Sequence, residues 1–327
     1  MDILVLGGGQ FVGRHIVEAA LANGHRVATF NRGRTGSQLF PEVERILGDR
    51  TGDLSALENR RFDAVIDVSG YVPRFVRNSA QLLRDRSDFY LFISTISVYA
   101  PGTDAPDEDS PVGTLEDETV EEVTGATYGP LKALCEQEVR AAFGERCAVV
   151  RPGLVAGPFD PTDRFTYWPH RVDLGGEVLA PGRPGGRFQY VDVRDLAAFA
   201  LHLVEKQHDG TFNAVRPPEL WGDLLEAARL ASGAEARFIW ADEAFLAEQG
   251  VRPWVDLPMW IPEGPDAGLT RVSSARALAA GMPVRPLGET VLDTLNWDRS
   301  RGAEEFRWAL SPEREREVLD AWTARHG

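Results

Sequence analysis

The chain has 327 residues, 43% of them hydrophobic, and its 50 acidic and 35 basic side chains give a net charge of -15. This composition supports a substantial buried core and excludes a disordered or fibrous protein. The negative charge repels phosphate backbones and anionic membranes, so we expect neither nucleic acid nor a membrane as a main partner.

The sequence shows no pattern typical of a membrane anchor, a secretion signal or a metal site. Its longest apolar stretches are strand-sized, well short of the ~20 residues of a membrane helix. Met1 is followed directly by Asp2 and the apolar run Ile3–Leu6, which is typical of a first strand rather than a signal peptide. Cys135 and Cys147 are too few for a disulfide framework, and no Cys/His cluster has zinc spacing. We expect a cytoplasmic protein without a metal.

Short apolar runs alternate with helical patterns through the first half of the chain. The expected strands are Ile3–Leu6, Val27–Phe30, Arg45–Leu47, Ala64–Val68, Phe89–Ser94 and Ala148–Val150. The expected helices are Gly13–Asn23, Val76–Arg84 and Leu131–Phe143. Strand and helix in this alternation predict an α/β fold with a doubly wound parallel sheet, the Rossmann fold.

The pattern changes after about residue 155, where glycine and proline become frequent and all eight tryptophans lie. Helical segments are expected at Val193–Lys206, Leu220–Ser232 and Ala241–Gln249. We predict a first domain over residues 1–155 and a smaller α+β part over residues 156–327. Within that part, residues from about 188 to 215 are expected to return to the Rossmann sheet.

A glycine-rich turn follows the first strand directly. The turn reads Gly7-Gly8-Gly9-Gln10-Phe11-Val12-Gly13 and leads into a helix. Glycines let backbone N–H groups approach a pyrophosphate at the helix N-terminus, although a tight turn without a ligand has the same pattern. No G-K-[ST] follows, so we expect a dinucleotide rather than a nucleoside triphosphate. Residues 1–155 are therefore expected to bind NAD(P).

The end of the second strand indicates which dinucleotide is bound. An NAD site usually offers a carboxylate there for the ribose 2′-hydroxyl. This strand instead runs into Asn31-Arg32-Gly33-Arg34, whose guanidiniums suit a 2′-phosphate. We predict NADP(H), with NAD(H) as the alternative, and surface arginines without a ligand as the simpler interpretation. Further cofactor contacts are expected at Asp49, Arg50, Ser69, Gly70 and Pro152.

A Y-x-x-x-K pair, Tyr128 and Lys132, begins the third predicted helix, and Thr95 ends the strand before it. At this spacing the phenol and the ammonium lie on one helix face. A neighbouring Lys⁺ favours phenolate and would bring the tyrosine, whose ordinary pKa is ~10, toward neutral pH. We predict Tyr128 as general acid/base, Lys132 as the residue that lowers its pKa, and Thr95 as the group that orients the substrate oxygen.

These motifs resemble the short-chain dehydrogenase/reductases, specifically the extended and atypical branch that contains sugar-nucleotide epimerases and dehydratases. The resemblance rests on the glycine turn, Gly48-Asp49, the strand-end Ser94–Tyr99 segment, and the Tyr128/Lys132 pair. It continues through Val150–Pro158, Tyr190–Ala197 and Ser273–Arg276, which together extend over nearly the whole chain. The resemblance implies the triad Thr95, Tyr128 and Lys132, NADP(H) as cofactor, and a possible homodimer.

The chain departs from that family pattern at several places. Gln10 replaces the middle glycine of the turn. Ile96-Ser97 stands where sugar dehydratases carry an acidic pair, which argues against dehydration. Phe188 occupies a position where sugar-nucleotide enzymes often hold a phosphate with arginine, and Arg187 lies one residue earlier.

The aromatic second half offers candidate walls for a substrate pocket. We expect substrate contacts at Phe165, Trp168, Arg187 and Trp260, while core packing is the alternative for each tryptophan. Tyr71 and Ser97 are further candidates in the first domain. Residues 104–122 hold nine acids and no base, which predicts a solvated loop, with a lid over the site as the alternative.

The sequence predicts an NADP(H)-dependent oxidoreductase that moves hydride between nicotinamide and a carbonyl or secondary alcohol of a small-molecule substrate. One alternative is an epimerase, of a sugar or sugar nucleotide, that retains its cofactor. The alternative from another class is a non-catalytic nucleotide- or RNA-binding member of the fold.

Overall fold

The structure is a computed structural model that describes residues 1–36, 38–302 and 306–326. The chain divides into two compact units. Unit 1 contains residues 1–153, 193–215 and 272–283, and unit 2 contains residues 154–192, 216–271 and 284–327. Among the described residues, no helix is long and apolar enough to cross a membrane.

Unit 1 is a seven-stranded sheet whose strands are all parallel, which confirms the predicted Rossmann fold. The order across the sheet is β11-β6-β5-β4-β1-β2-β3. These strands are β1 (Asp2–Leu6), β2 (Arg26–Asn31), β3 (Glu44–Leu47), β4 (Phe62–Asp67), β5 (Ser87–Ile93), β6 (Cys147–Pro152) and β11 (Gly210–Ala214).

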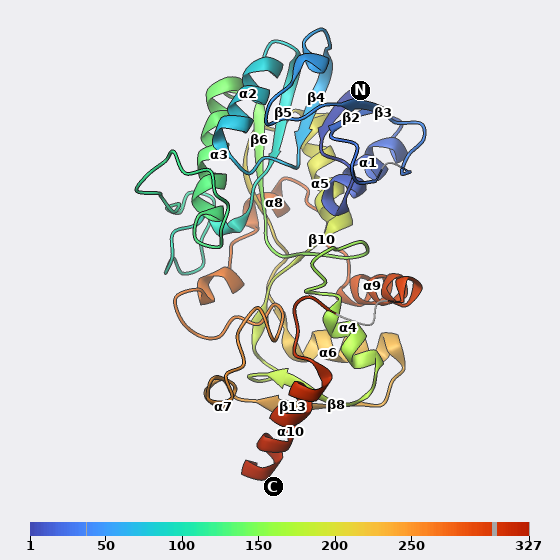
Figure 1. Cartoon of the computed structure of the whole chain (residues 1–327), viewed down its shortest axis with the longest axis vertical. Helices are drawn as coiled ribbons and strands as arrows, with labels where there is room; N and C mark the ends of the chain where they lie inside the picture. The colour runs from blue at the N-terminus through green and yellow to red at the C-terminus, as the bar shows by residue number, and fades with distance from the viewer. Residues whose placement is uncertain (37, 303–305, 327) are drawn as a thin grey trace. The chain divides into compact units, whose positions relative to one another are not determined.

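Helices cover both faces of this sheet, as its doubly apolar strands require. The pair α2 and α3 packs together, and α1 packs with α5, so that Figure 1 shows the two pairs on opposite sides of the strands. The helical elements of unit 1 are α1 (Phe11–Ala22), η1 (Ser55–Leu57), α2 (Pro73–Leu83), η2 (Ile96–Val98), α3 (Tyr128–Phe143), α5 (Val193–Lys206) and α8 (Ala275–Ala279).

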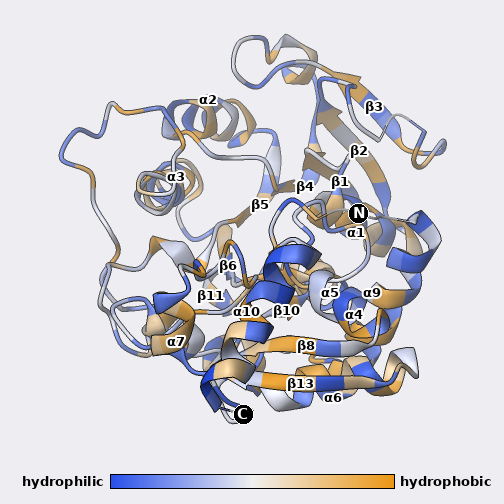
Figure 2. Cartoon of the chain, turned by 60° about the horizontal axis from the view of Figure 1, so that its bottom comes forward, coloured by the Kyte–Doolittle hydropathy of each residue, from blue (hydrophilic) through white to orange (hydrophobic). Residues whose placement is uncertain are grey.

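Unit 2 is built from short strands and longer helices around its own aromatic core. A two-stranded parallel sheet, β8 (Gly176–Pro181) with β13 (Ala236–Ala241), presents apolar stretches that Figure 2 colours orange. Its remaining strands are β7 (Val155–Ala156), β9 (Arg187–Phe188), β10 (Val191–Asp192) and β12 (Glu219–Leu220). Its helices are α4 (Tyr167–Asp173), α6 (Trp221–Ser232), α7 (Glu243–Glu248), η3 (Ala267–Thr270), α9 (Leu287–Arg301) and α10 (Pro312–His326).

Candidate active site

The glycine turn between β1 and α1 adopts a backbone that side chains would disturb. Gly7 and Gly8 have φ of 119° and 89°, values that favour glycine. A Cβ on Gly7 would lie 2.5 Å from Val68 Cγ2, and one on Gly13 would lie 2.7 Å from the Gly8 nitrogen. The turn therefore keeps backbone rather than side chains at the start of α1, which fits the approach of a dinucleotide pyrophosphate.

Asn31, at the end of β2, braces this turn. Its amide Nδ2 donates to the Gly7 carbonyl at 3.0 Å, and its Oδ1 accepts from the Gly33 N–H at 2.8 Å. The following Arg32 and Arg34 are exposed. The sequence thus places two exposed cations beside a strand end that is held by the Asn31 amide and carries no carboxylate.

Asp49 lies near these arginines. Hydrogen bonds from the N–H and hydroxyl of Thr51 hold the pKa of Asp49 below its ordinary value, and the charges of Arg32 and Arg34 lower that pKa further. The guanidiniums of Arg32 and Arg34 therefore already interact with the Asp49 carboxylate. A bound phosphate would compete with Asp49 for these two arginines.

The guanidinium of Arg50 is not available for the cofactor contact that the sequence suggested. Its Nη1 and Nη2 donate to the two oxygens of Asp67 at 2.7 and 2.9 Å, and Tyr90 donates to the same carboxylate at 2.9 Å. Asp67 has no exposed surface. Burial opposes the charge on Arg50, but Asp67 outweighs it and raises the Arg50 pKa. A buried carboxylate at the end of β4 has drawn this arginine inward, and no local sequence pattern marks that long-range pair.

Ser69 and Gly70 follow β4 and lie next to the glycine turn. The Ser69 hydroxyl donates to the Leu6 carbonyl at 3.0 Å, and its N–H donates to Asp67 at 3.0 Å. The Gly70 carbonyl accepts a hydrogen bond from Lys132. Pro152 is buried at the end of β6. These residues link the ends of the central strands.

The three residues of the predicted triad lie on neighbouring elements of unit 1. Thr95 follows β5 and caps η2, Tyr128 is the first residue of α3, and Lys132 lies one turn later. The neighbouring Thr95 hydroxyl lowers the pKa of Tyr128, against the larger effect of burial, which raises it. The Tyr71 ring centre is 6.4 Å from that of Tyr128.

Lys132 is buried, and its ammonium group donates two hydrogen bonds to main-chain carbonyls. Its Nζ donates to the Gly70 carbonyl at 2.7 Å and to the Ile93 carbonyl at 2.6 Å, and lies 4.2 Å from the Phe92 ring centre. Burial lowers its pKa to about 8. The lysine thus ties the ends of β4 and β5 together beneath the tyrosine.

The expectation that Lys132 lowers the pKa of Tyr128 is wrong in this arrangement. Burial, followed by the charge of Tyr71, raises the pKa of Tyr128 to about 12. The physical reason is that the ammonium is committed to two carbonyls and that the phenol is largely shielded from water. At neutral pH Tyr128 is a protonated hydroxyl.

Gly129 is a site residue that the sequence analysis passed over. A Cβ at this position would lie 2.0 Å from the Ser97 carbonyl oxygen. Only a glycine therefore lets the first turn of α3 approach η2 this closely, which brings Tyr128 to Thr95. The signal was present in the sequence as Tyr-Gly-Pro at the helix start.

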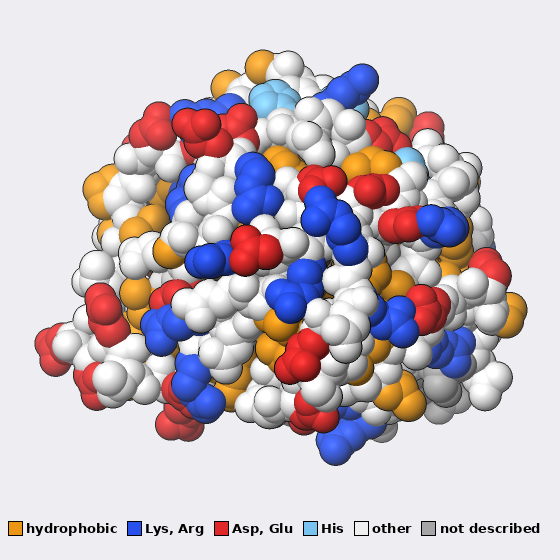
Figure 3. Space-filling model, turned by 90° about the horizontal axis from the view of Figure 1, so that it is seen from above, with side chains coloured by type: hydrophobic (Ala, Val, Ile, Leu, Met, Phe, Trp, Pro, Cys, Tyr) orange, Lys and Arg blue, Asp and Glu red, His pale blue; other side chains and the backbone are white. Residues whose placement is uncertain are grey.

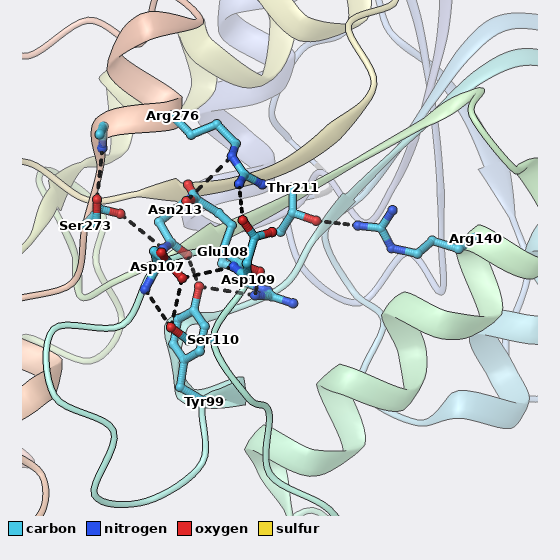
Figure 4. A network of polar contacts seen from close by, with 12 residues as sticks. Tyr99, Asp107, Glu108, Asp109, Ser110, Arg140, Thr211, Asn213, Ser273 and Arg276 are labelled. Atoms are coloured by element: carbon cyan, nitrogen blue, oxygen red, sulfur yellow. Dashed lines mark hydrogen bonds and ion pairs between the residues drawn. The ribbon is translucent and has the colours of Figure 1, made fainter.

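The acidic segment 104–122 is anchored at its base rather than fully solvated as expected. Glu108 is 8% exposed and accepts from the Asn213 N–H at 2.8 Å. Tyr99 donates to Asn213 Oδ1 at 2.6 Å, and Arg276 reaches Asp109 at 2.8 Å. Figure 4 shows these side chains converging. The sequence could not reveal the anchor because Asn213 and Arg276 lie far along the chain.

Most of the expected substrate contacts in unit 2 are core residues, which corrects that prediction. Phe165 and Trp168 have no exposed surface, and Trp260 is 4% exposed. The indole N–H of Trp168 donates to the Pro258 carbonyl at 2.9 Å, which satisfies its polar atom inside the core. Arg187, on β9, and Ser97, in η2, are exposed. Among the described residues, no group of three His, Cys, Asp or Glu is arranged to hold a metal.

Fold and site together define a Rossmann protein of the short-chain dehydrogenase/reductase type. The model of the NAD dependent epimerase/dehydratase family matches residues 3–214, so the chain belongs to that family. The resemblance to the extended branch of these proteins is thereby confirmed.

Two curated relatives match part of the chain. The epimerase family protein SDR39U1 of Bos taurus is 26% identical over 243 residues, which are 66% of this chain and 75% of the relative. The chloroplast stem-loop binding protein of 41 kDa b from Arabidopsis thaliana is 23% identical over 231 residues, which are 64% of this chain. That match spans only 57% of the Arabidopsis protein.

Solved structures share the fold over most of the chain. The UDP-glucuronic acid 4-epimerase of Bacillus cereus, solved with NAD, has a TM-score of 0.68 and 16% identity, covering 94% of this chain and 100% of its own. Human SDR39U1, solved with NADPH, has a TM-score of 0.62 and 23% identity, covering 90% of this chain and 99% of its own. At these identities the likeness shows the fold.

Proposed function

We propose that this protein is an NADP(H)-dependent oxidoreductase in which Tyr128 exchanges a proton with the oxygen of a carbonyl or secondary alcohol. The observation that carries the proposal is the close approach of α3 to η2, which brings Tyr128 near Thr95. The Gly70 and Ile93 carbonyls hold the Lys132 ammonium one turn further along α3. Two hydroxyls thus lie near the carboxyl ends of the sheet, on the unit that also carries the glycine turn.

Each residue has a separate task in this proposal. Nicotinamide, when bound, supplies or accepts the hydride. Tyr128, protonated at neutral pH because burial raises its pKa to about 12, donates its proton to the substrate oxygen in the direction of reduction. Thr95 holds the same oxygen in position. Lys132 keeps the ends of β4 and β5 at a fixed separation.

The glycine turn would hold the pyrophosphate, and the end of β2 would select the cofactor. Arg32 and Arg34 are exposed where an NAD site usually offers a carboxylate, which supports NADP(H). Human SDR39U1, a protein of the same fold, was solved with NADPH. The substrate is a small molecule that carries the reacting oxygen.

The first experiment is to inspect the purified protein for bound nicotinamide by absorbance and mass spectrometry, and then to titrate NADPH and NADH separately. Tight binding of NADPH with weak binding of NADH supports the proposed cofactor. Copurified NAD⁺ that does not exchange would overturn it in favour of the epimerase. Binding of neither cofactor would leave the glycine turn without its proposed ligand.

An epimerase that retains its cofactor is the second candidate. It is favoured by the UDP-sugar epimerases among the solved structures, including the Bacillus cereus enzyme, which covers 94% of this chain. Such an enzyme oxidises and then reduces one substrate, so its cofactor shows no net turnover. Monitoring absorbance during turnover of a substrate separates the two reactions.

A nucleic-acid-binding role is the candidate from another class, because the Arabidopsis relative is named for stem-loop binding. The net charge of -15 argues against it. On the face drawn in Figure 3, the described Lys and Arg side chains are interspersed with Asp and Glu. Filter binding of RNA across a range of salt concentrations tests this role directly.

A further inference from the structure

We propose that unit 2 contains a binding site for the oxyanion of a small molecule, a carboxylate or a phosphate, centred on Arg164. This residue lies in the loop that follows β7 and precedes α4. The site uses none of the residues assigned to the cofactor or to proton transfer, so it stands independently of the proposed function.

Two indole rings hold the Arg164 guanidinium in place. Its Cζ lies 5.3 Å from the ring centre of Trp254 and 4.9 Å from that of Trp308. These are cation–π distances, and such contacts leave the N–H donors at the edge of the guanidinium plane available. Both tryptophans are partly exposed, so part of the cluster faces solvent.

Within the part of the chain that the structure describes, the guanidinium has no oxygen partner. Its Nε is buried without a hydrogen-bond acceptor, and none of the residues in 1–36, 38–302 and 306–326 forms an ion pair or hydrogen bond with Arg164. Most arginines of this chain, such as Arg171 with Glu315 at 2.6 Å, do find a carboxylate. A partly buried cation without a counter-ion is costly, and an anion would remove that cost.

The charges around Arg164 leave room for a bound anion. Burial lowers the pKa of Arg164 and the charge of Arg307 lowers it further, while Asp160 raises it. Asp160 does not close the pair, because its two oxygens accept from the N–H and hydroxyl of Thr162 at 2.8 and 3.1 Å. Burial raises the pKa of Asp160 to about 6.

A second cation shares the same ring. The Arg307 Cζ lies 4.9 Å from the Trp308 ring centre, so two guanidiniums flank one indole. Like charges this close repel unless an anion lies between them or solvent screens them. The backbone of this cluster is also strained, since Asp163 and Trp254 have φ of 57° and 63°.

The planar fork of an arginine matches the two oxygens of a carboxylate or two of a phosphate. The experiment titrates the full-length protein with sodium phosphate and, separately, with sodium acetate, and follows tryptophan fluorescence. Sodium chloride at equal ionic strength is the control for screening. We expect a saturable change with at least one oxyanion and none with chloride. The stronger of the two titrations identifies the oxyanion class.

The variant Arg164→Gln removes the charge and the fork, and we expect it to weaken oxyanion binding about thirtyfold or more. Arg237→Gln is the matched control, because this exposed arginine of the same unit pairs with Glu177 on the β8–β13 sheet. It should bind as the wild type does. Circular dichroism checks that both variants are folded.

Absence of any saturable response in the wild type would overturn the proposal, and so would equal responses of wild type and Arg164→Gln. An internal carboxylate that fills the site would produce the first of these results. The variant Tyr128→Phe separates this inference from the proposed function, because it should bind the oxyanion unchanged even where oxidoreductase activity is lost.

Discussion

Arg151 and Glu136 form a two-point ion pair inside unit 1, with Nε to Oε1 at 3.0 Å and Nη2 to Oε2 at 2.7 Å. The pair joins β6 to α3, the helix that begins with Tyr128. Ser94 donates to the same carboxylate at 2.5 Å, so the residue before Thr95 is fixed to that helix as well. One buried carboxylate thus links the strand end before Thr95 to the helix that begins with Tyr128.

Replacing Glu136 with Gln should therefore destabilise the fold. Both side chains are nearly buried, at 7% and 6% exposure, and the substitution leaves the Arg151 charge without its partner. We expect a loss of about 3–5 kcal/mol in the free energy of unfolding, measured in urea. Glu138→Gln, two residues along the same helix, breaks the more exposed pair with Arg77 and should cost less than about 1 kcal/mol. Equal losses would contradict the inward position of Glu136.

Lys132 should make stability depend on pH in the alkaline range. Burial lowers its pKa in the folded protein to about 8, against 10.5 for the ordinary side chain. Between these values the unfolded chain binds more protons, so stability rises with pH by an amount on the order of 3 kcal/mol in total. Cys135 works in the opposite direction, because burial raises its pKa to about 12.

The test of the lysine effect is a comparison of unfolding free energies from pH 7.5 to 10.5 for wild type and Lys132→Met. The variant keeps Cys135 and should lack the rise, so the difference between the two curves gives the effect of removing the lysine, including its effect on Cys135. Parallel curves would mean that the ammonium is well solvated, contrary to its burial.

The local part of this architecture could be predicted from the sequence, because β1, the glycine turn and α1 are written in consecutive residues. The Tyr128/Lys132 pair was equally visible, since helical spacing alone brings the two residues together. The pKa values of the pair could not be predicted from the sequence. The carbonyls that hold Lys132 belong to Gly70 and Ile93, which lie far from it along the chain.

Pairs between distant segments explain the errors. Arg50 was expected to contact the cofactor, but its guanidinium forms an ion pair with the buried Asp67. Trp168 was expected in a pocket wall, yet it packs edge-to-face on Trp221 inside the unit 2 core, with ring centres 4.8 Å apart. The sequence indicates that a tryptophan ring will be buried. Whether it is buried against other side chains or against a ligand depends on the folded structure.

Removing the charges of Arg32 and Arg34 should change cofactor choice rather than cofactor binding as such. In Arg32→Gln/Arg34→Gln we expect the Kd for NADPH to rise about tenfold or more, with the Kd for NADH little changed, because only NADPH carries the 2′-phosphate. Arg61→Gln, an exposed arginine paired with Asp88, is the control for net charge. Equal weakening for both cofactors would assign the arginines to general electrostatic attraction.

Tyr128→Phe should abolish turnover while leaving cofactor binding intact. The phenylalanine keeps the ring beside Tyr71 and removes only the hydroxyl. Loss of a general acid typically lowers kcat by about 10²–10⁴. Once a substrate is found, kcat and the NADPH Kd are measured for both proteins. An unchanged kcat would remove Tyr128 from the reaction.

Gly129→Ala should show whether the close approach of α3 to η2 is required. The added Cβ would lie 2.0 Å from the Ser97 carbonyl oxygen, a backbone atom that cannot rotate away. We expect a loss of about 1–3 kcal/mol in unfolding free energy, despite the better helix propensity of alanine, together with reduced activity as Tyr128 is displaced from Thr95. Gly125→Ala is the matched control, since this exposed glycine lies three residues before Tyr128 and its Cβ would meet nothing within 4 Å. If Gly129→Ala were as stable and active as Gly125→Ala, the contact would be loose enough to open, and the position of Tyr128 would depend on the Arg151–Glu136 pair alone.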